Sequence, residues 1–193
     1  MTRFSLFCCQ VPIFLPYPLS PITYHFSKVV GSIPYQITSP LIHQLADLAE
    51  KIKIDSVRKY YDKKPLKSND TLKKAATDQA NYMNKKTCLT HFQNEDKKKY
   101  AVGNRVSYYG YLYSYVGENL SYSFLYTHTN DSTGKTAVTS TYEQTANIII
   151  KLWVASTGHF TNITRSQFTN TGVAVSFDKK KMIVYACQVF ASH

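Results

Sequence analysis

The distribution of proline divides this chain into two parts. Six of the seven prolines lie among the first forty of the 193 residues, and only Pro65 follows them. Proline lacks a backbone donor and clashes with the preceding helical turn, so a segment rich in it does not form a regular helix or a central strand. The sequence therefore predicts a Pro-rich leader over residues 1–38 and one folded domain over residues 39–193.

The leader has two interpretations, and both stay open at this point. In the first it is a secretion signal, with Arg3 as the basic start, Phe4–Leu15 as the apolar middle and a small residue for cleavage at Val29-Val30-Gly31. In the second it is an extended segment outside the fold. Four prolines within Phe4–Ile22 argue against a transmembrane helix.

Composition limits the class of protein. Hydrophobic residues make up 44% and charged residues 18%, which excludes a disordered chain, and four cysteines are too few for a disulfide-stapled miniprotein. The formal net charge of +11 favours anionic partners such as a cell surface or a nucleic acid. Solvated surface lysines are one interpretation of this charge, and a single patch for an anionic partner is the other. The lysine clusters are Lys63-Lys64, Lys73-Lys74, Lys85-Lys86, Lys97–Lys99 and Lys179–Lys181.

Residues 39–193 alternate helical and strand-like patterns. Ser39-Pro40 starts one predicted helix, which runs to Tyr61, and Asn69 or Asp70 starts a second, which runs to Lys86. A third is predicted from the capping box Ser140–Glu143 to Gly158, with Trp153 in its buried stripe.

Three further segments lie between and after these helices. The alternation of Tyr111, Tyr113 and Tyr115 predicts a strand, either as a packed sheet face or as a platform for ligand stacking. Residues 127–136 are predicted to be a polar loop. Residues 173–177 and 182–190, joined by a turn at 178–181, predict a terminal hairpin.

No compact catalytic or nucleotide-binding motif is present: HExxH, GxGxxG, GxSxG, the P-loop and CxxC pairs are all missing. RNA-binding aromatic signatures are missing as well, so there is no strong nucleic-acid signal. His91, His159 and the Gly117-Glu118-Asn119-Leu120 segment remain as candidates, because each lies at the boundary of a predicted element.

These pieces together resemble the CAP superfamily, also called SCP-like domains, which includes cysteine-rich secretory, antigen-five and pathogenesis-related proteins. The resemblance covers about residues 41–190. Its pieces come in the order Pro65-Leu66, the small-residue helix with Leu72, Ala76 and Ala80, then His91, Gly117–Leu120, Trp153 with Ser156, Gly158–Ile163, Gly172–Ala174 and the closing strand Tyr185–Phe190.

The resemblance implies a three-layer α/β/α sandwich around a small, mainly antiparallel sheet, and a secreted protein. It also implies a cleft lined by His91, Glu118, Ser156 and His159. Ser156 stands where the family usually has a second acid. Five residues separate Trp153 from His159, as in short bacterial-type domains, so sterol binding is not expected.

His91, His159 and Glu118 are residue types that bind zinc, and a structural polar cluster is the alternative. Without metal, Glu118 is expected to accept hydrogen bonds from both imidazoles and raise their pKa values. Cys88 and Cys187 are either one disulfide or two free core thiols.

Three functions follow from these residues. The first is a secreted domain, without a catalytic residue, that binds a small ligand, a metal ion or a partner in the cleft. The second is a zinc-dependent hydrolase that uses His91, His159 and Glu118. The third, argued from charge alone, is a protein that binds nucleic acid or an anionic surface.

Overall fold

The computed structural model describes residues 54–131, 134–139 and 141–193. The predicted leader and the start of the first helix lie outside these residues, so the boundary between 38 and 39 stays a prediction. The predicted end of the first helix is confirmed, because α2 spans Asp55–Tyr60. No helix in the described ranges is long and apolar enough to cross a bilayer.

A four-stranded sheet organises the fold. Its order is β1 (Lys67–Ser68), β5 (Asn170–Asp178), β6 (Ile183–Ser192) and β2 (Tyr115–Phe124). β1 runs parallel to β5, while β5–β6 and β6–β2 are antiparallel. The predicted mainly antiparallel sheet and the terminal hairpin β5–β6 are therefore confirmed.

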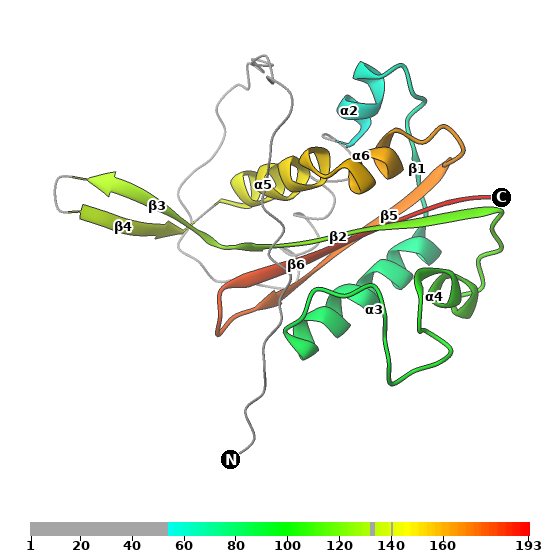
Figure 1. The fold of residues 1–193 in the computed structure, drawn as a ribbon, viewed down its shortest axis with the longest axis horizontal. Coiled ribbons are helices and arrows are strands. Elements are labelled where there is room, and N and C mark those ends of the chain that lie inside the picture. The colour runs from blue at the N-terminus through cyan, green and yellow to red at the C-terminus, as the bar shows by residue number, and fades with distance from the viewer. Residues whose placement is uncertain (1–53, 132–133, 140) are drawn as a thin grey trace. The chain divides into compact units, whose positions relative to one another are not determined.

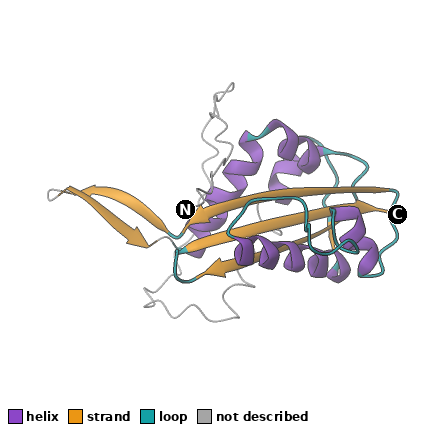
Figure 2. Cartoon of the chain, turned by 60° about the horizontal axis from the view of Figure 1, so that its bottom comes forward, coloured by secondary structure: helices purple, strands orange, loops and turns teal. Residues whose placement is uncertain are grey.

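Helices cover both faces of this sheet, which confirms the three-layer α/β/α sandwich (Figures 1 and 2). α3 (Asp70–Lys86) and α4 (Val102–Tyr108) lie on one face, and α5 (Tyr142–Ala155) and α6 (Thr157–Thr164) lie on the other. Side chains of β6 alternate between the two cores, because successive residues of a strand point to opposite faces. Val184, Ala186 and Phe190 join the core that contains the fully buried Trp153, and Tyr185, Cys187 and Val189 join the α3 core.

Helix α3 forms where the sequence predicts it. The Asn69 Oδ1 atom accepts hydrogen bonds from the backbone amides of Thr71 and Leu72, each at 3.0 Å, and thereby caps the helix. Its buried face contains mostly small residues, which lets the helix approach the sheet closely. A methyl group at Gly172 of β5 would collide with the backbone of Leu72 and Lys73. Gly172 is therefore required by packing.

The predicted tyrosine strand is wrong in extent. Residues 102–108 form α4, and β2 begins only at Tyr115. Tyr111 is buried and Tyr113 is exposed, so they do not share one face of a strand. Tyr111 lies outside the sheet because its ring is buried in the α3 core and stacks on His193, and this packing outweighs its β preference.

The predicted polar loop at 127–136 is also wrong. The backbone there forms a two-stranded antiparallel hairpin of β3 (Tyr126–Asp131) and β4 (Gly134–Thr139). The threonine-rich composition explains the error: threonine is polar, which suggests a loop, but its branched Cβ favours strands.

The third predicted helix is shifted at both ends. Thr141 Oγ1 accepts a hydrogen bond from the Gln144 amide at 3.1 Å, and Gln144 Oε1 accepts one from the Thr141 amide at 2.8 Å. The capping box thus starts one residue later than predicted. α5 ends at Ala155, and Gly158 lies inside α6 and does not terminate a helix. His159 therefore lies on a helix.

Candidate functional site

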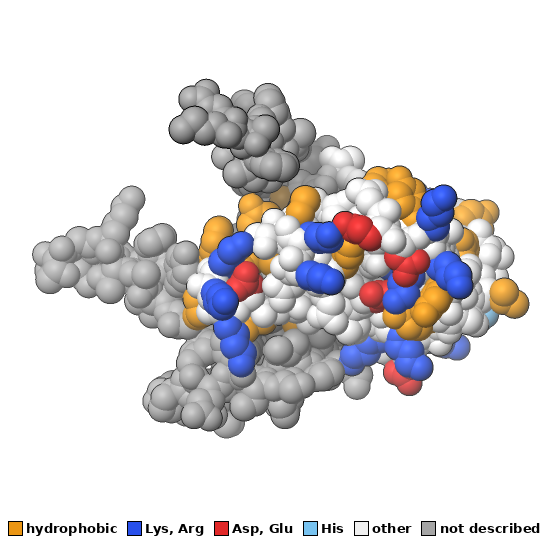
Figure 3. All heavy atoms as spheres, turned by 90° about the horizontal axis from the view of Figure 1, so that it is seen from below, with side chains coloured by type: hydrophobic (Ala, Val, Ile, Leu, Met, Phe, Trp, Pro, Cys, Tyr) orange, Lys and Arg blue, Asp and Glu red, His pale blue; other side chains and the backbone are white. Residues whose placement is uncertain are grey.

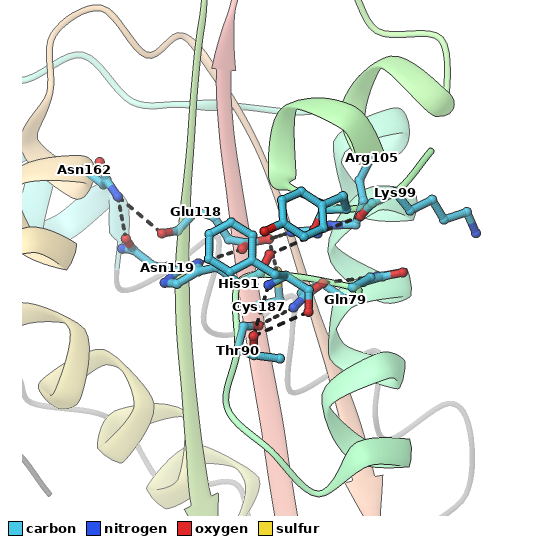
Figure 4. A network of polar contacts seen from close by, with 12 residues as sticks. Gln79, Thr90, His91, Lys99, Arg105, Glu118, Asn119, Asn162 and Cys187 are labelled. Carbon is cyan, nitrogen blue, oxygen red and sulfur yellow. Dashed lines mark hydrogen bonds and ion pairs between the residues drawn. The ribbon is translucent and has the colours of Figure 1, made fainter. Parts of the chain in front are cut away.

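The carboxylate of Glu118 is the centre of a buried polar network (Figure 4). Glu118 lies on β2, and its side chain is only 2% exposed. His91 Nδ1 lies 2.8 Å from Glu118 Oε1, and the His91 side chain is 50% exposed. Because an ionised carboxylate only accepts hydrogen bonds, His91 donates through Nδ1 and presents the rest of its ring at the surface.

Arg105 of α4 binds the other oxygen of Glu118. Its guanidinium is completely buried and donates from Nη2 to Glu118 Oε2. Nη1 lies 3.1–3.3 Å from the backbone oxygens of His91, Lys99 and Tyr100. One buried cation therefore neutralises Glu118 and holds the segment that carries His91. Nothing in the local sequence distinguishes Arg105 from a surface arginine, and it was not among the predicted site residues.

Two glutamines hold the same segment against α3. Gln79 is fully buried on α3 and donates from Nε2 to the carbonyl of Thr90, the residue before His91. Gln93 Nε2 donates to Gln79 Oε1 at 3.1 Å, and the Gln93 amide donates to the Tyr100 carbonyl at 2.9 Å. Hydrogen bonds on both sides of His91 thus restrict its backbone. The only sequence signal for Gln79 was its place in the small-residue stripe of α3.

Asparagines connect β2 to α6 on the opposite face of the strand. Asn119 Nδ2 donates to the His159 carbonyl at 3.1 Å, and Asn162 Nδ2 donates to Asn119 Oδ1 at 2.9 Å. A methyl group at Gly117 would lie 2.8 Å from the Phe168 ring. Each member of the Gly117-Glu118-Asn119 segment therefore has its own physical role: close packing, a buried charge, and attachment of α6.

His159 comes near the network from α6 without joining it. Its Nδ1 atom is buried and has no hydrogen-bond partner among the described residues. Burial lowers the pKa of His159, and the charge of nearby His91 lowers it further. The expectation that Glu118 raises the pKa of both histidines is therefore wrong for His159.

Ser156 forms the junction between α5 and α6. Its amide donates to the Trp153 carbonyl at 3.3 Å, and its carbonyl accepts from the Phe160 amide at 2.8 Å. Within the described part of the chain, no hydrogen bond joins the Ser156 side chain to His91, Glu118 or His159. Ser156, which occupies the position of the expected second acid, therefore joins the two helices through its backbone and adds no charge.

A comparison with models of known protein families identifies the family of this chain. The model of the CAP, or cysteine-rich secretory protein, family matches residues 53–190. The chain belongs to the CAP family. Among curated proteins, none matches this CAP chain at a significant level.

Solved structures share the CAP fold at low sequence identity. An outer surface protein of Borrelia burgdorferi has a TM-score of 0.61 and 16% identity, covering 83% of this chain and 99% of that one. An extracellular SCP-domain protein of Bacillus anthracis has a TM-score of 0.59 and 16% identity, covering 83% of this chain and 45% of that one. The CAP domain of enterococcal PrgA has a TM-score of 0.51 and 19% identity, covering 81% and 64%. This CAP chain thus spans less than half of the Bacillus protein.

The two cysteines of the described CAP domain are both free thiols, so the disulfide alternative is wrong. Cys88 is exposed, whereas Cys187 is buried on β6 and donates from Sγ to Glu118 Oε2 at 3.5 Å. Burial raises the pKa of Cys187 well above its ordinary value, and the Glu118 charge raises it further. The Cys187 thiol therefore stays protonated and is no nucleophile.

The three predicted zinc ligands of this CAP domain are not arranged around one point. Both oxygens of Glu118 already accept hydrogen bonds, and the Arg105 charge beside them repels a cation. No group of three His, Cys, Asp or Glu side chains within the described ranges is placed to hold a metal ion. Glu118 does not fit as a zinc ligand in this arrangement. Zinc binding stays a prediction.

The predicted cleft also stays a prediction. Two hollows of the described residues lie along α3 and α4, and they are lined by residues other than His91, Glu118, Ser156 and His159. His91 and Glu118 are in direct contact, and His159 lies near enough to His91 for their charges to repel. The candidate site of this CAP domain is therefore the surface around the two imidazoles.

Proposed function

We propose that this chain is a secreted CAP domain that binds a ligand through His91 and His159 and catalyses no reaction. The observation that carries the proposal is the half-exposed His91 ring, fixed by a buried Glu118–Arg105 ion pair. A ring held by buried charge loses little freedom on binding, which favours recognition. The ligand is a small molecule, a metal ion or a partner that accepts contact with two imidazoles.

The chemistry of the same residues supports binding over catalysis. A carboxylate acts as a general base only when it is free to take a proton, and Glu118 is already bound by His91 and Arg105. Ser156 supplies no carboxylate, and Cys187 is a protonated, buried thiol. None of these groups is ready to act as a base or a nucleophile.

Secretion is supported by two observations. The Arg3 and Phe4–Leu15 pattern is typical of an export signal, and two proteins of similar fold are described as extracellular and as an outer surface protein. Sequencing the N-terminus of protein from its native cell tests this part. A start near Ser32 is expected. A start at Met1 or Thr2 would contradict cleavage and count against export.

The zinc hydrolase is the second candidate, because His159 Nδ1 is buried without a described partner close to His91. Metal analysis of protein purified without chelator separates the two functions, together with ester, peptide and phosphoester hydrolysis assays. We expect no zinc-dependent turnover, and any zinc bound to the wild type to be lost in both His91→Ala and His159→Ala. Stoichiometric zinc with hydrolysis that disappears in His91→Ala would overturn the non-catalytic proposal.

A direct test of binding follows the imidazole signals of His91 and His159 by NMR during titration with zinc chloride and a small-molecule library. A ligand of the proposed site shifts both signals, and His91→Gln weakens its binding. His193 is the internal control, because it stacks on Tyr111 and is not part of the site. Ligands that shift only His193, or none of the three, would contradict the proposed site.

A further inference from the structure

Two hollows lie side by side along α3 and α4, away from the histidines. One, of about 450 Å³, is lined by Lys98, Gly103, Asn104, Ser107, Tyr108 and Tyr113. The other, of about 550 Å³, lies against the first three turns of α3 and is lined by Asp70, Lys73, Lys74, Thr77, Asp78, Asn81 and Tyr109. Figure 3 shows many basic side chains on this side of the molecule, with fewer acidic ones among them.

The wall between the hollows is a rigid pair of tyrosines. The Tyr108 ring lines the first hollow, the Tyr109 ring lines the second, and their centroids are 5.1 Å apart in an edge-to-face contact. Lys99 Nζ lies 4.6 Å from the Tyr108 ring centroid and 2.9 Å from Asp78 Oδ2, and the Tyr109 hydroxyl donates to the same oxygen at 3.2 Å. Tyr108 is nonetheless 53% exposed. These contacts restrain the two rings, which lowers the entropy that a ligand would lose by ordering them.

The groups around this wall are of three kinds that suit one class of ligand. Exposed aromatic faces are electron-rich and attract the C–H edges of a sugar ring. Among the neutral polar groups, Asn81 and Ser107 can donate to and accept from sugar hydroxyls. Thr77 Oγ1 can accept, because its proton goes to the Lys73 carbonyl at 2.8 Å, and Asn104 can donate through its amide nitrogen. Lys74 and Lys98 are exposed cations at the same two hollows. We propose that the hollows along α3 and α4 bind an acidic polysaccharide.

Other polyanions fit this surface less well. Duplex DNA carries one negative charge per about 1.7 Å of its axis and needs a continuous basic surface. Here the carboxylates of Asp70 and Asp78 lie in the lining of the second hollow and interrupt the basic surface, and a carboxylate can accept hydrogen bonds from sugar hydroxyls. An anionic membrane presents a wide, flat surface. Two separate hollows divided by a pair of tyrosine rings suit a linear polymer better. The site is separate from the imidazole site, since neither His91 nor His159 is among the residues that line the hollows.

The test measures binding of the full-length protein to a heparin-derived hexasaccharide and to a galacturonic acid hexamer, by calorimetry at 0.15 M salt. Cellohexaose is the neutral control. We expect binding of at least one acidic oligosaccharide, and about tenfold weaker binding in the double variant Lys74→Gln/Lys98→Gln. The matched variant Lys179→Gln/Lys180→Gln removes the same charge from the β5–β6 turn, and it should change affinity by less than about twofold.

Tyr108→Ala separates ring stacking from charge, because it leaves every lysine in place. We expect it to weaken binding about fivefold or more, while circular dichroism and thermal unfolding show an intact fold. Equal effects of the two lysine pairs, an unchanged affinity in Tyr108→Ala, or no binding of either acidic hexamer would overturn the proposal. Tighter binding to a DNA duplex or to phosphatidylglycerol vesicles than to both hexamers would also overturn it. None of these outcomes bears on the proposed ligand site at His91 and His159, which is tested by its own variants.

Discussion

Arg105 Nη2 donates a hydrogen bond to Glu118 Oε2 between α4 and β2, where the two side chains are 0% and 2% exposed. A charge buried to this degree is stable only with its partner, since the cost of removing it from water is several kcal/mol. The pair therefore links the stability of the domain to the placement of His91.

Removal of the Arg105 charge should destabilise the domain strongly. Arg105→Met leaves Glu118 buried without its cation, and we expect a loss of about 3–5 kcal/mol in the free energy of unfolding, measured by urea denaturation. Arg105→Met/Glu118→Leu removes both charges and should recover part of this loss. Lys98→Met on the surface nearby is the control, with an effect within about 0.5 kcal/mol. A loss below about 1 kcal/mol in Arg105→Met would contradict the role assigned to the pair.

The close approach of α3 to β5 should make Gly172 intolerant of a side chain. Gly172→Ala places a methyl group into the backbone of Leu72 and Lys73, and we expect a loss of about 1–3 kcal/mol in unfolding free energy. Gly158→Ala is the matched control, because a methyl group there meets nothing within 4 Å and alanine favours the helix. If both substitutions leave the thermal unfolding midpoint unchanged, the helix does not pack against Gly172 as described.

Glu95 fastens the His91 segment to α3 and should titrate at unusually low pH. Lys86 Nζ lies 2.5 Å from Glu95 Oε1, and the Tyr82 hydroxyl donates to Glu95 Oε2 at 2.5 Å. The Lys86 contact, followed by the Tyr82 hydrogen bond, lowers the pKa of Glu95 from 4.5 to about 2. A depressed pKa stabilises the folded state above pH 4.5, and this contribution is lost as the pH falls toward 2.

NMR titration of the Glu95 carboxyl carbon at low salt measures this pKa. Lys86→Gln should raise it more than Tyr82→Phe does, because the Lys86 contact has the larger effect. Added salt should also raise it, since the pair is exposed to solvent. A Glu95 pKa at or above 4.5 in the wild-type protein would show that neither contact persists in solution.

The thiols of Cys88 and Cys187 should differ sharply in reactivity. In a Cys8→Ser/Cys9→Ser background, a thiol reagent at neutral pH is expected to modify Cys88 quickly. Cys187 should react only after unfolding, because it is buried and its pKa is raised. Mass spectrometry under non-reducing conditions counts the labels. Two rapidly labelled thiols, or a mass lower by the two hydrogens of a disulfide, would contradict the structure.

Local patterns were sufficient for the elements whose evidence lies within a few residues. The Asn69 cap and the apolar spacing of α3 both involve residues within a few positions of one another. The end of α3 at Lys86 was predicted correctly. The strand predicted from Tyr111, Tyr113 and Tyr115 was too long, because Tyr111 is buried in the α3 core and the strand begins only at Tyr115. The loop at 127–136 failed because polarity was weighed above the branched Cβ of threonine.

The candidate site also contains residues that the sequence indicated and residues that it did not. His91, Glu118 and His159 came from their places at element boundaries and from the family resemblance, and the structure places His91 and Glu118 in contact. Arg105, Gln79 and Asn162 did not come from it as site residues, although they hold those side chains in place. Buried polar residues carry no local signature, because their partners lie elsewhere in the chain: Glu118 lies 13 positions after Arg105, and Asn162 lies 43 positions after Asn119.

Amino-acid order alone was enough to establish the α/β/α architecture, the α3 helix and the family, because short-range periodicity and motif order survive without coordinates. Folding in three dimensions decided that Glu118 is neutralised by Arg105, that Ser156 forms the junction between α5 and α6, and that Cys187 is a buried free thiol. These properties depend on burial and on which groups meet, and both arise only when segments distant in the chain exclude water from the same place.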